Sequence, residues 1–162
     1  MHIRISANDG VPIYLQIVNQ VKYLVASGRL EPGAELSPIR VLAEQLLISA
    51  FPDLPGPRLL VLGDMGEVGQ QGPQFHAEAG RYAKAKGVTF LAGVGELAQV
   101  AVEAFEGAGH SLNMDQLIDT VLGHMPRVRS VLVKGSRFMR MERVVDALMP
   151  YAVKNQERRR AP

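Results

Sequence analysis

The first fifty residues carry apolar side chains at the spacing of helices. Between residues 14 and 25, and again between residues 39 and 47, the apolar positions recur three or four residues apart, as on one face of an α-helix. Gly28 is a natural end for the first helix, and Ser37 followed by Pro38 is a natural start for the second. Residues 2–6 alternate weakly, which predicts a short edge strand. We therefore expect a mainly helical N-terminal segment.

The pattern changes after residues 51–57, because three prolines in seven residues cannot continue a helix. Beyond them, predicted strands at residues 58–63, 88–92, 110–112 and 128–134 alternate with predicted helices at residues 73–86, 96–105, 115–123 and 139–148. Short links between alternating strands and helices imply parallel pairing through right-handed crossovers. The pattern thus predicts an α/β fold, with a mostly parallel sheet and helices on both faces.

One stretch organises this alternation, Arg58-Leu-Leu-Val-Leu-Gly-Asp-Met-Gly-Glu-Val-Gly69. Its apolar run is typical of a strand that is buried on both faces. A loop containing Asp64, Met65 and Glu67 follows directly. In open α/β sheets, ligands bind just beyond the carboxyl ends of the strands. We therefore expect a candidate site in this loop.

Composition narrows the class of protein. The 162 residues are 47% apolar and 21% charged, which suits one domain, or one domain with an appendage, that buries a real core. A net charge of +2 is too small to imply a nucleic-acid partner, and the absence of Cys excludes disulfides and thiolate chemistry. No run approaches 18 apolar residues and no signal peptide opens the chain, so we expect a cytoplasmic protein without a membrane partner.

Three motifs stand in order within residues 1–48: Asp9-Gly-Val-Pro-Ile-Tyr-Leu-Gln-Ile17, Gly28-Arg-Leu-Glu-Pro-Gly33 and Ile39-Arg-Val-Leu-Ala-Glu-Gln-Leu-Leu-Ile48. This segment resembles the start of a GntR-family transcriptional regulator of the YtrA type. The resemblance implies the first two helices of a winged helix-turn-helix domain. The recognition helix and wing that should follow are replaced by Ser49-Ala-Phe-Pro-Asp-Leu-Pro55. Only a weak DNA-backbone contact, such as Arg40, is then expected.

A second set of motifs lies between residues 54 and 148: Leu62-Gly-Asp-Met-Gly-Glu-Val-Gly69, Phe75-His76 followed by Gly80, and Val133-Lys-Gly-Ser-Arg137 followed by Met141-Glu142. This part resembles the C-terminal domain of Mur ligases of the D-alanyl-D-alanine-adding (MurF) type. The resemblance implies a Rossmann-like sheet. Complete enzymes of this family use ATP to join an amino acid or dipeptide to a nucleotide-linked peptide through an acyl-phosphate.

That chemistry needs parts that these motifs do not supply. A Gly-rich phosphate loop ending in Gly-Lys-Ser/Thr is absent, since Lys134-Gly-Ser136 has those letters in another order at the end of a strand. We expect no catalytic residues and no cofactor, with ATP and Mg belonging to the complete ligases only. Residues 37–47 occupy the slot of a helix that the ligases place before this strand, and we expect them to pack on the sheet in its place.

By resemblance, the remnant ligand-binding residues are Asp64, Met65, Glu67, His76, Lys134, Ser136 and Arg137. Lys134 and Arg137 end a strand and open a helix, where a carboxylate or phosphate can sit; the alternative is a solvated loop. Asp64 and Glu67 suit a metal–nucleotide complex, but carboxylates in such turns are as often turn formers. A lone His such as His76 is more often packed or capping than catalytic.

No metal site is expected, because His2, His110 and His124 are scattered without the spacing of metal ligands. The run Arg158–Arg160 predicts a solvated basic tail, with weak non-specific nucleic-acid binding at most. Incomplete sheet edges allow a homodimer.

The preferred interpretation is a composite protein without a complete active site or a DNA-reading helix. Its parts are a truncated winged-helix-like segment (1–48), a Pro-rich junction (49–57), a ligase-like α/β domain (58–150) and a basic tail (151–162). Two alternatives stay open. One is a ligase fragment that retains weak nucleotide or dipeptide binding, and the other is a fragment of a GntR-type DNA-binding regulator.

Overall fold

The computed structural model describes residues 13–29, 48, 51–66, 68–107 and 109–160. The strand predicted at residues 2–6 and the helix predicted at residues 37–47 therefore lie outside the described residues. The first predicted helix is confirmed as α1 (Ile13–Ala26). It ends as expected at Gly28, which has a φ of +68° and whose N–H donates to the Val25 carbonyl oxygen at 3.1 Å.

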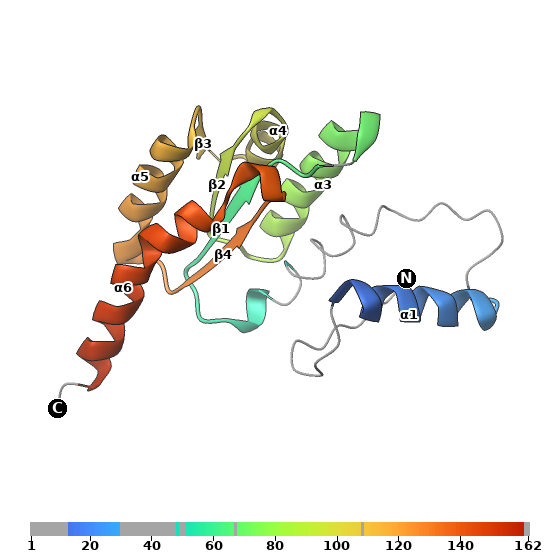
Figure 1. Cartoon of the computed structure of the whole chain (residues 1–162), viewed down its shortest axis with the longest axis horizontal. Coiled ribbons are helices and arrows are strands. Elements are labelled where there is room, and N and C mark those ends of the chain that lie inside the picture. Colours follow the sequence, from blue (N-terminus) through green and yellow to red (C-terminus); the bar gives the residue numbers. More distant parts are fainter. Residues whose placement is uncertain (1–12, 30–47, 49–50, 67, 108, 161–162) are drawn as a thin grey trace.

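Four strands form one parallel sheet, which confirms the predicted fold class (Figure 1). They are β1 (Arg58–Gly63), β2 (Phe90–Val94), β3 (His110–Ser111) and β4 (Ser130–Lys134), and their spatial order is β3-β2-β1-β4. β1 pairs with β2 on one side and with β4 on the other. It is therefore an interior strand of the sheet, like β2.

The second strand begins two residues later than predicted. Val88 instead closes the end of the preceding helix, where its N–H donates to the Ala83 carbonyl oxygen at 3.1 Å. Thr89 bridges to Arg58, since its N–H donates to the Arg58 carbonyl oxygen and its Oγ1 accepts from the Arg58 N–H. Both residues are thus connectors, although their β-branched side chains favour a strand.

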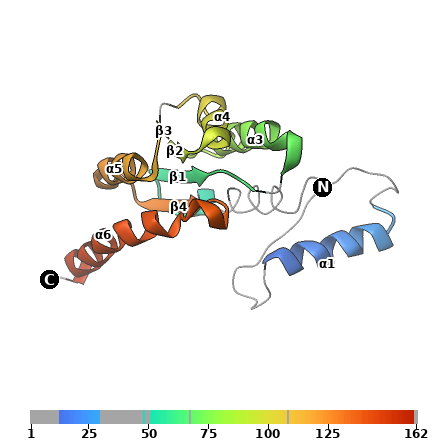
Figure 2. The same ribbon diagram turned by 45° about the horizontal axis from the view of Figure 1, so that its top comes forward.

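Helices cover both faces of the sheet, as Figure 2 shows. One face packs against α3 (Gly72–Ala85) and α4 (Glu96–Ala104), and the other against α5 (Met114–His124) and α6 (Glu142–Arg160). Successive β1 residues point to opposite faces, so that Leu60 joins the first core and Leu59 joins the second. Burial on both faces explains the uninterrupted apolar run of this strand.

The last helix differs from its prediction at both ends. Met139 belongs to a short 3₁₀ turn, η4 (Arg137–Met139), and α6 starts only at Glu142. The helix then continues past Leu148 to Arg160 with Pro150 inside it, so the predicted end at Leu148 is wrong. A proline removes one N–H donor from the helical ladder, but here it does not end the helix.

Residues before β1 also belong to the core. Ile48 and Phe51, the latter in the 3₁₀ turn η1 (Phe51–Asp53), are each 2% exposed and pack in the same cluster as Leu60. Leu132 of β4 packs against that cluster. The predicted packing of residues 37–47 is outside the described residues, but the residue that follows them lies in the core on this face.

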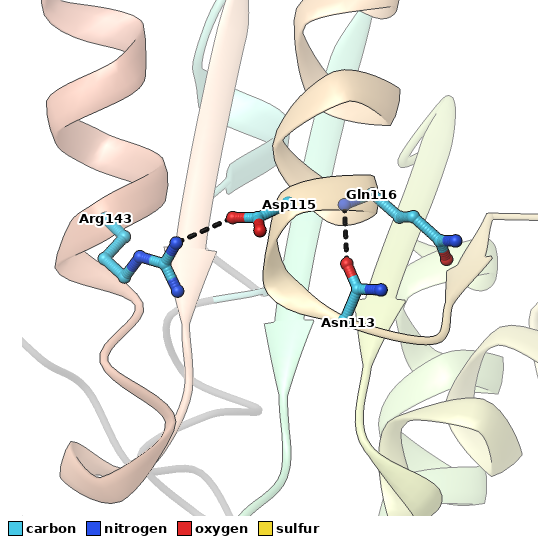
Figure 3. A network of polar contacts seen from close by, with 4 residues as sticks. All are labelled: Asn113, Asp115, Gln116 and Arg143. Atoms are coloured by element: carbon cyan, nitrogen blue, oxygen red, sulfur yellow. Dashed lines mark hydrogen bonds and ion pairs between the residues drawn. The ribbon is translucent and has the colours of Figure 1, made fainter.

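Polar contacts fix the α5–α6 side of the sheet (Figure 3). The Asn113 side chain caps α5 by accepting a hydrogen bond from the Gln116 N–H at 3.0 Å. Arg143 of α6 forms an ion pair with Asp115 of α5, with 2.7 Å between Nη2 and Oδ1. Among the described helices, none is long and apolar enough to cross a membrane.

Candidate functional site

Two loops meet at the carboxyl edge of the sheet. The 64–66 loop (Asp64, Met65, Gly66) follows β1, and the 135–137 loop (Gly135, Ser136, Arg137) follows β4. The Ser136 N–H donates to the Asp64 carbonyl oxygen at 3.1 Å, and the Gly66 N–H donates to the Ser136 Oγ in a very short hydrogen bond. The structure therefore brings together four of the residues singled out from the sequence: Asp64, Met65, Ser136 and Arg137.

Glycines permit this close approach. A Cβ on Gly135 would lie 2.7 Å from Met141 Cγ and 3.2 Å from the Gly63 Cα. A Cβ on Gly63 would likewise lie 2.8 Å from the Met141 sulfur. A larger residue at either position therefore requires the Met141 side chain to shift, and at Gly135 it also requires the Gly63 backbone to give way by a few tenths of an ångström.

The Asp64 side chain serves a neighbouring helix. Its Oδ1 accepts a hydrogen bond from the Ala98 N–H at 2.8 Å, at the start of α4. The N-cap residue of that helix, Gly95, has no side chain to do this, so Asp64 caps α4 from the loop after β1. A carboxylate is also favoured at this end of the helix dipole. Asp64 is thus neither a local turn former nor a free carboxylate.

His76 lies beneath the 64–66 loop and is 1% exposed. Its Nε2 is 3.0 Å from the Met65 nitrogen and its Nδ1 is 2.7 Å from the Gly72 carbonyl oxygen. A backbone N–H can only donate and a carbonyl can only accept, so Nε2 accepts and Nδ1 carries the proton. The ring is therefore neutral and of one tautomer, in agreement with its interpretation as a packed residue.

Burial lowers the pKa of His76 below its ordinary value of 6.5. The hydrogen bond to the Gly72 carbonyl and the negative charge of Asp64 act in the opposite direction but more weakly. Desolvation dominates because the ring lies beside an apolar cluster of Met65, Val68 and Phe75. Met65 is itself 4% exposed, so it contributes to this loop as a buried residue and not as a ligand-facing side chain.

Free positive charge gathers after β4. Lys134 is half-buried at the end of β4, level with Leu62 of β1, and Arg137 is exposed at the start of η4. Within the described part of the chain, neither side chain makes a hydrogen bond or ion pair, and the same is true of Arg140 nearby. These cations are available to an anion from solution.

Two predicted residues, Glu67 and Arg40, lie outside the described residues. Conversely, sequence reasoning missed Gly95, Ala98 and Arg140. A glycine between the end of a predicted strand and the start of a helix was the available signal for Gly95. For Arg140, the only signal available in the sequence was its position three residues after Arg137. Among the described residues, no three His, Asp or Glu side chains are grouped to hold a metal ion.

Comparison with known proteins gives one consistent result. No protein-family model matches the chain. The chain is 32% identical over 149 residues to the UDP-N-acetylmuramoyl-tripeptide–D-alanyl-D-alanine ligase of Escherichia coli K12, a match that covers 81% of this chain and 32% of that enzyme. The corresponding ligase of Buchnera aphidicola is 29% identical over 104 residues, covering 63% of this chain and 23% of that enzyme.

A solved structure agrees with these sequences. The MurF ligase from Thermotoga maritima, determined in complex with ADP, superimposes with a TM-score of 0.53 and 26% identity. The match covers 71% of this chain and 27% of that one. The chain thus spans between about a quarter and a third of the length of the ligases that it matches.

The ligase match reaches further toward the N-terminus than the motifs indicate. It covers 81% of 162 residues, about 131, whereas only 114 residues follow residue 48. Part of the segment that resembles a regulator therefore also aligns with the ligase, and these relatives give no support to a GntR segment or a composite protein. Over most of its length, the chain is similar to D-alanyl-D-alanine-adding ligases in both sequence and fold.

Proposed function

We propose that the chain carries part of a D-alanyl-D-alanine-adding ligase and binds a nucleotide or a dipeptide weakly at the carboxyl edge of its sheet. The observation that carries the proposal is the pair of cations, Lys134 and Arg137, which make no hydrogen bond or ion pair with other described residues and lie beside two loops that are joined by hydrogen bonds. The similarity to MurF-type ligases supports this alternative over the composite interpretation.

The chemistry of the loops suits an anionic ligand. ATP presents phosphates and D-alanyl-D-alanine presents a carboxylate, and both are recognised by ammonium and guanidinium groups. The Asp64 carboxylate, in the loop after β1, is directed to the N-terminus of α4, so its charge is partly compensated. Because Arg137 is exposed to water, we expect binding in the millimolar range.

Thermal unfolding with added ligand tests the proposal. Either MgATP or D-alanyl-D-alanine should raise the melting temperature with a saturable dependence on concentration. A ligand at ten times its Kd stabilises the folded state by about 1.4 kcal/mol. For a chain of this length, that corresponds to an increase of about 3–6 °C.

Matched variants assign the effect to the site. Lys134→Gln and Arg137→Gln should each abolish most of the ligand-induced shift. Arg129→Gln removes an exposed arginine at the opposite end of β4 and should leave the shift unchanged. The proposal is wrong if neither ligand shifts the wild-type transition, or if the three variants respond alike.

A further inference from the structure

We propose that His76 is a protonation-sensitive clamp on the 64–66 loop, and that adding a proton to its Nε2 releases the loop and weakens anion binding at the carboxyl edge. The release follows from geometry in this chain alone, whereas the effect on binding rests on the proposed function above.

The clamp works only when the ring is neutral. Nε2 faces the Met65 N–H at 3.0 Å and accepts its hydrogen bond. A proton on Nε2 places two N–H groups against each other, which removes that hydrogen bond and sets two donors in conflict. The added proton cannot be placed on the other ring nitrogen instead, because Nδ1 already carries a proton and donates it to the Gly72 carbonyl at 2.7 Å. The ring cannot therefore take up a proton and keep both contacts.

The charge of the protonated ring is poorly compensated where it lies. Met65, Val68 and Phe75 form an apolar cluster, with Leu97 of α4 packed against it. From the end of β1, Asp64 favours a positive ring, but its Oδ1 is bonded to the Ala98 N–H of α4. On α3 itself, the carboxylate of Glu78 accepts from the Gln74 side chain on the exposed surface. Protonation is thus relieved best by movement of the loop away from the ring.

Movement of the loop reaches the site by two hydrogen bonds. Asp64 and Gly66, on either side of Met65, both contact Ser136, through the Asp64 carbonyl oxygen and the Gly66 N–H. Ser136 precedes Arg137, so a displaced 64–66 loop no longer holds the 135–137 loop in place. His76 is accordingly a positioning residue, because it acts on the site through Met65 and Ser136.

The first experiment needs no ligand. NMR of the wild-type protein at neutral pH should show the Nδ1–H tautomer of His76. As pH falls below the ordinary His range, the amide signals of Met65, Gly66 and Ser136 should shift together with the His76 ring. His76→Gln, which keeps an acceptor but does not titrate in this range, should lose these shifts. His124→Gln, which alters a histidine at the end of α5, should retain them.

The second experiment measures affinity for D-alanyl-D-alanine and for MgATP at pH 7.5 and at one unit below the His76 transition. Only about a tenth of the molecules then have a neutral ring, so the apparent affinity should fall about tenfold. His76→Gln should show no such fall beyond the titration of the ligand itself.

The outcomes separate the two proposals. An Nε2–H tautomer, or loop amides that ignore the His76 titration, overturns the clamp whatever the ligands do. Loop amides that follow His76 without any binding at pH 7.5 support the clamp as a structural device and overturn the proposed function. If the loop amides follow the His76 titration but the ligands bind equally strongly at both pH values, the claim that His76 controls anion binding is overturned.

Discussion

Gly95 and Asp64 share one small volume between the end of β2 and the start of α4. Gly95 has φ +110° and ψ 161°, a backbone region that is essentially restricted to glycine. A Cβ there would collide with the Asp64 carboxylate, which caps α4. The capping of α4 therefore requires glycine at position 95 as much as it requires the Asp64 carboxylate.

Gly95→Ala should lower the free energy of unfolding by about 2–4 kcal/mol, the sum of backbone strain and loss of the Asp64 cap. Gly87→Ala is the matched control, because Gly87 also has a positive φ (+73°) but open space around it. It should cost only about 1–2 kcal/mol. Denaturant unfolding measures both values, and equal losses would contradict the collision with Asp64.

His76 makes stability depend on pH in a defined direction. Its folded pKa is lowered by burial, so between that pKa and the unfolded value near 6.5 the unfolded chain binds more protons. The stability contributed by the neutral ring is complete above about pH 6.5 and is lost as pH falls below it. Each unit of difference between the two pKa values is worth about 1.4 kcal/mol once pH is below both.

Chemical denaturation between pH 5 and 8 checks this dependence. His76→Gln should flatten the fall in stability on the acid side. The pKa of His124 is also lowered, first by desolvation and then by Arg127, so His124→Gln should flatten it as well, through a group away from the 64–66 loop. A slope in His76→Gln as steep as that of the wild type would show that His76 does not contribute to it.

At the scale of elements, Gly80 sets the distance between α3 and α4. A Cβ on this residue would meet the backbone of Ala101, at 2.9 Å from its carbonyl carbon and 3.1 Å from its Cα. At this point Gly80 of α3 therefore lies directly against the backbone of α4, with no side chain between the two helices. This contact also fixes α4, whose N-terminus receives the Asp64 carboxylate.

Gly80→Ala should destabilise the fold by about 1–3 kcal/mol, because backbone atoms cannot yield as a flexible side chain can. Gly123→Ala offers the comparison, since Gly123 lies in α5 with nothing within 4 Å of an added Cβ. That variant should be stabilised by up to about 1 kcal/mol through helix propensity. Thermal or denaturant unfolding of both variants is the measurement. If Gly80→Ala is stabilised like Gly123→Ala, the close contact between α3 and α4 does not limit the residue at position 80.

For the molecule as a whole, two residues before β1, Ile48 and Phe51, belong to the core, whereas residues 53–57 are exposed. Phe51 lies in the cluster that joins β1, α3 and α4, against which β4 packs through Leu132. Proline-rich composition predicts a junction at residues 49–57, and Phe51 anchors it in the core through its buried side chain. The alignment with the E. coli ligase, which includes residues on the N-terminal side of residue 49, is consistent with this packing.

Phe51→Ala should reduce the free energy of unfolding by about 3–5 kcal/mol, as expected for a fully buried aromatic side chain. Phe138→Ala is the control, because Phe138 is 65% exposed and its loss should change stability by no more than about 0.5 kcal/mol. Comparable, small effects in both variants would mean that the segment around residue 51 is dispensable for the fold.

The sequence by itself determined the fold class, the burial of β1 on both faces and the edge of the sheet where the loops lie. These features follow from local periodicity: a run buried on both faces, helices with one apolar stripe, and glycines at strand ends. The ligase motifs likewise lie within single short segments, so their resemblance needed no tertiary information. The regulator resemblance rests on the same kind of local match, and the comparisons did not support it.

Only the tertiary structure decided what the chosen residues do. Asp64 caps α4 at Ala98, 34 positions away, and Ser136, in the loop after β4, contacts Gly66 from 70 positions away. His76 accepts a hydrogen bond from the Met65 N–H, and Met65 itself is buried. Such roles depend on contacts between distant segments, and pairing of strands across a parallel sheet creates those contacts without leaving a periodic trace in the sequence.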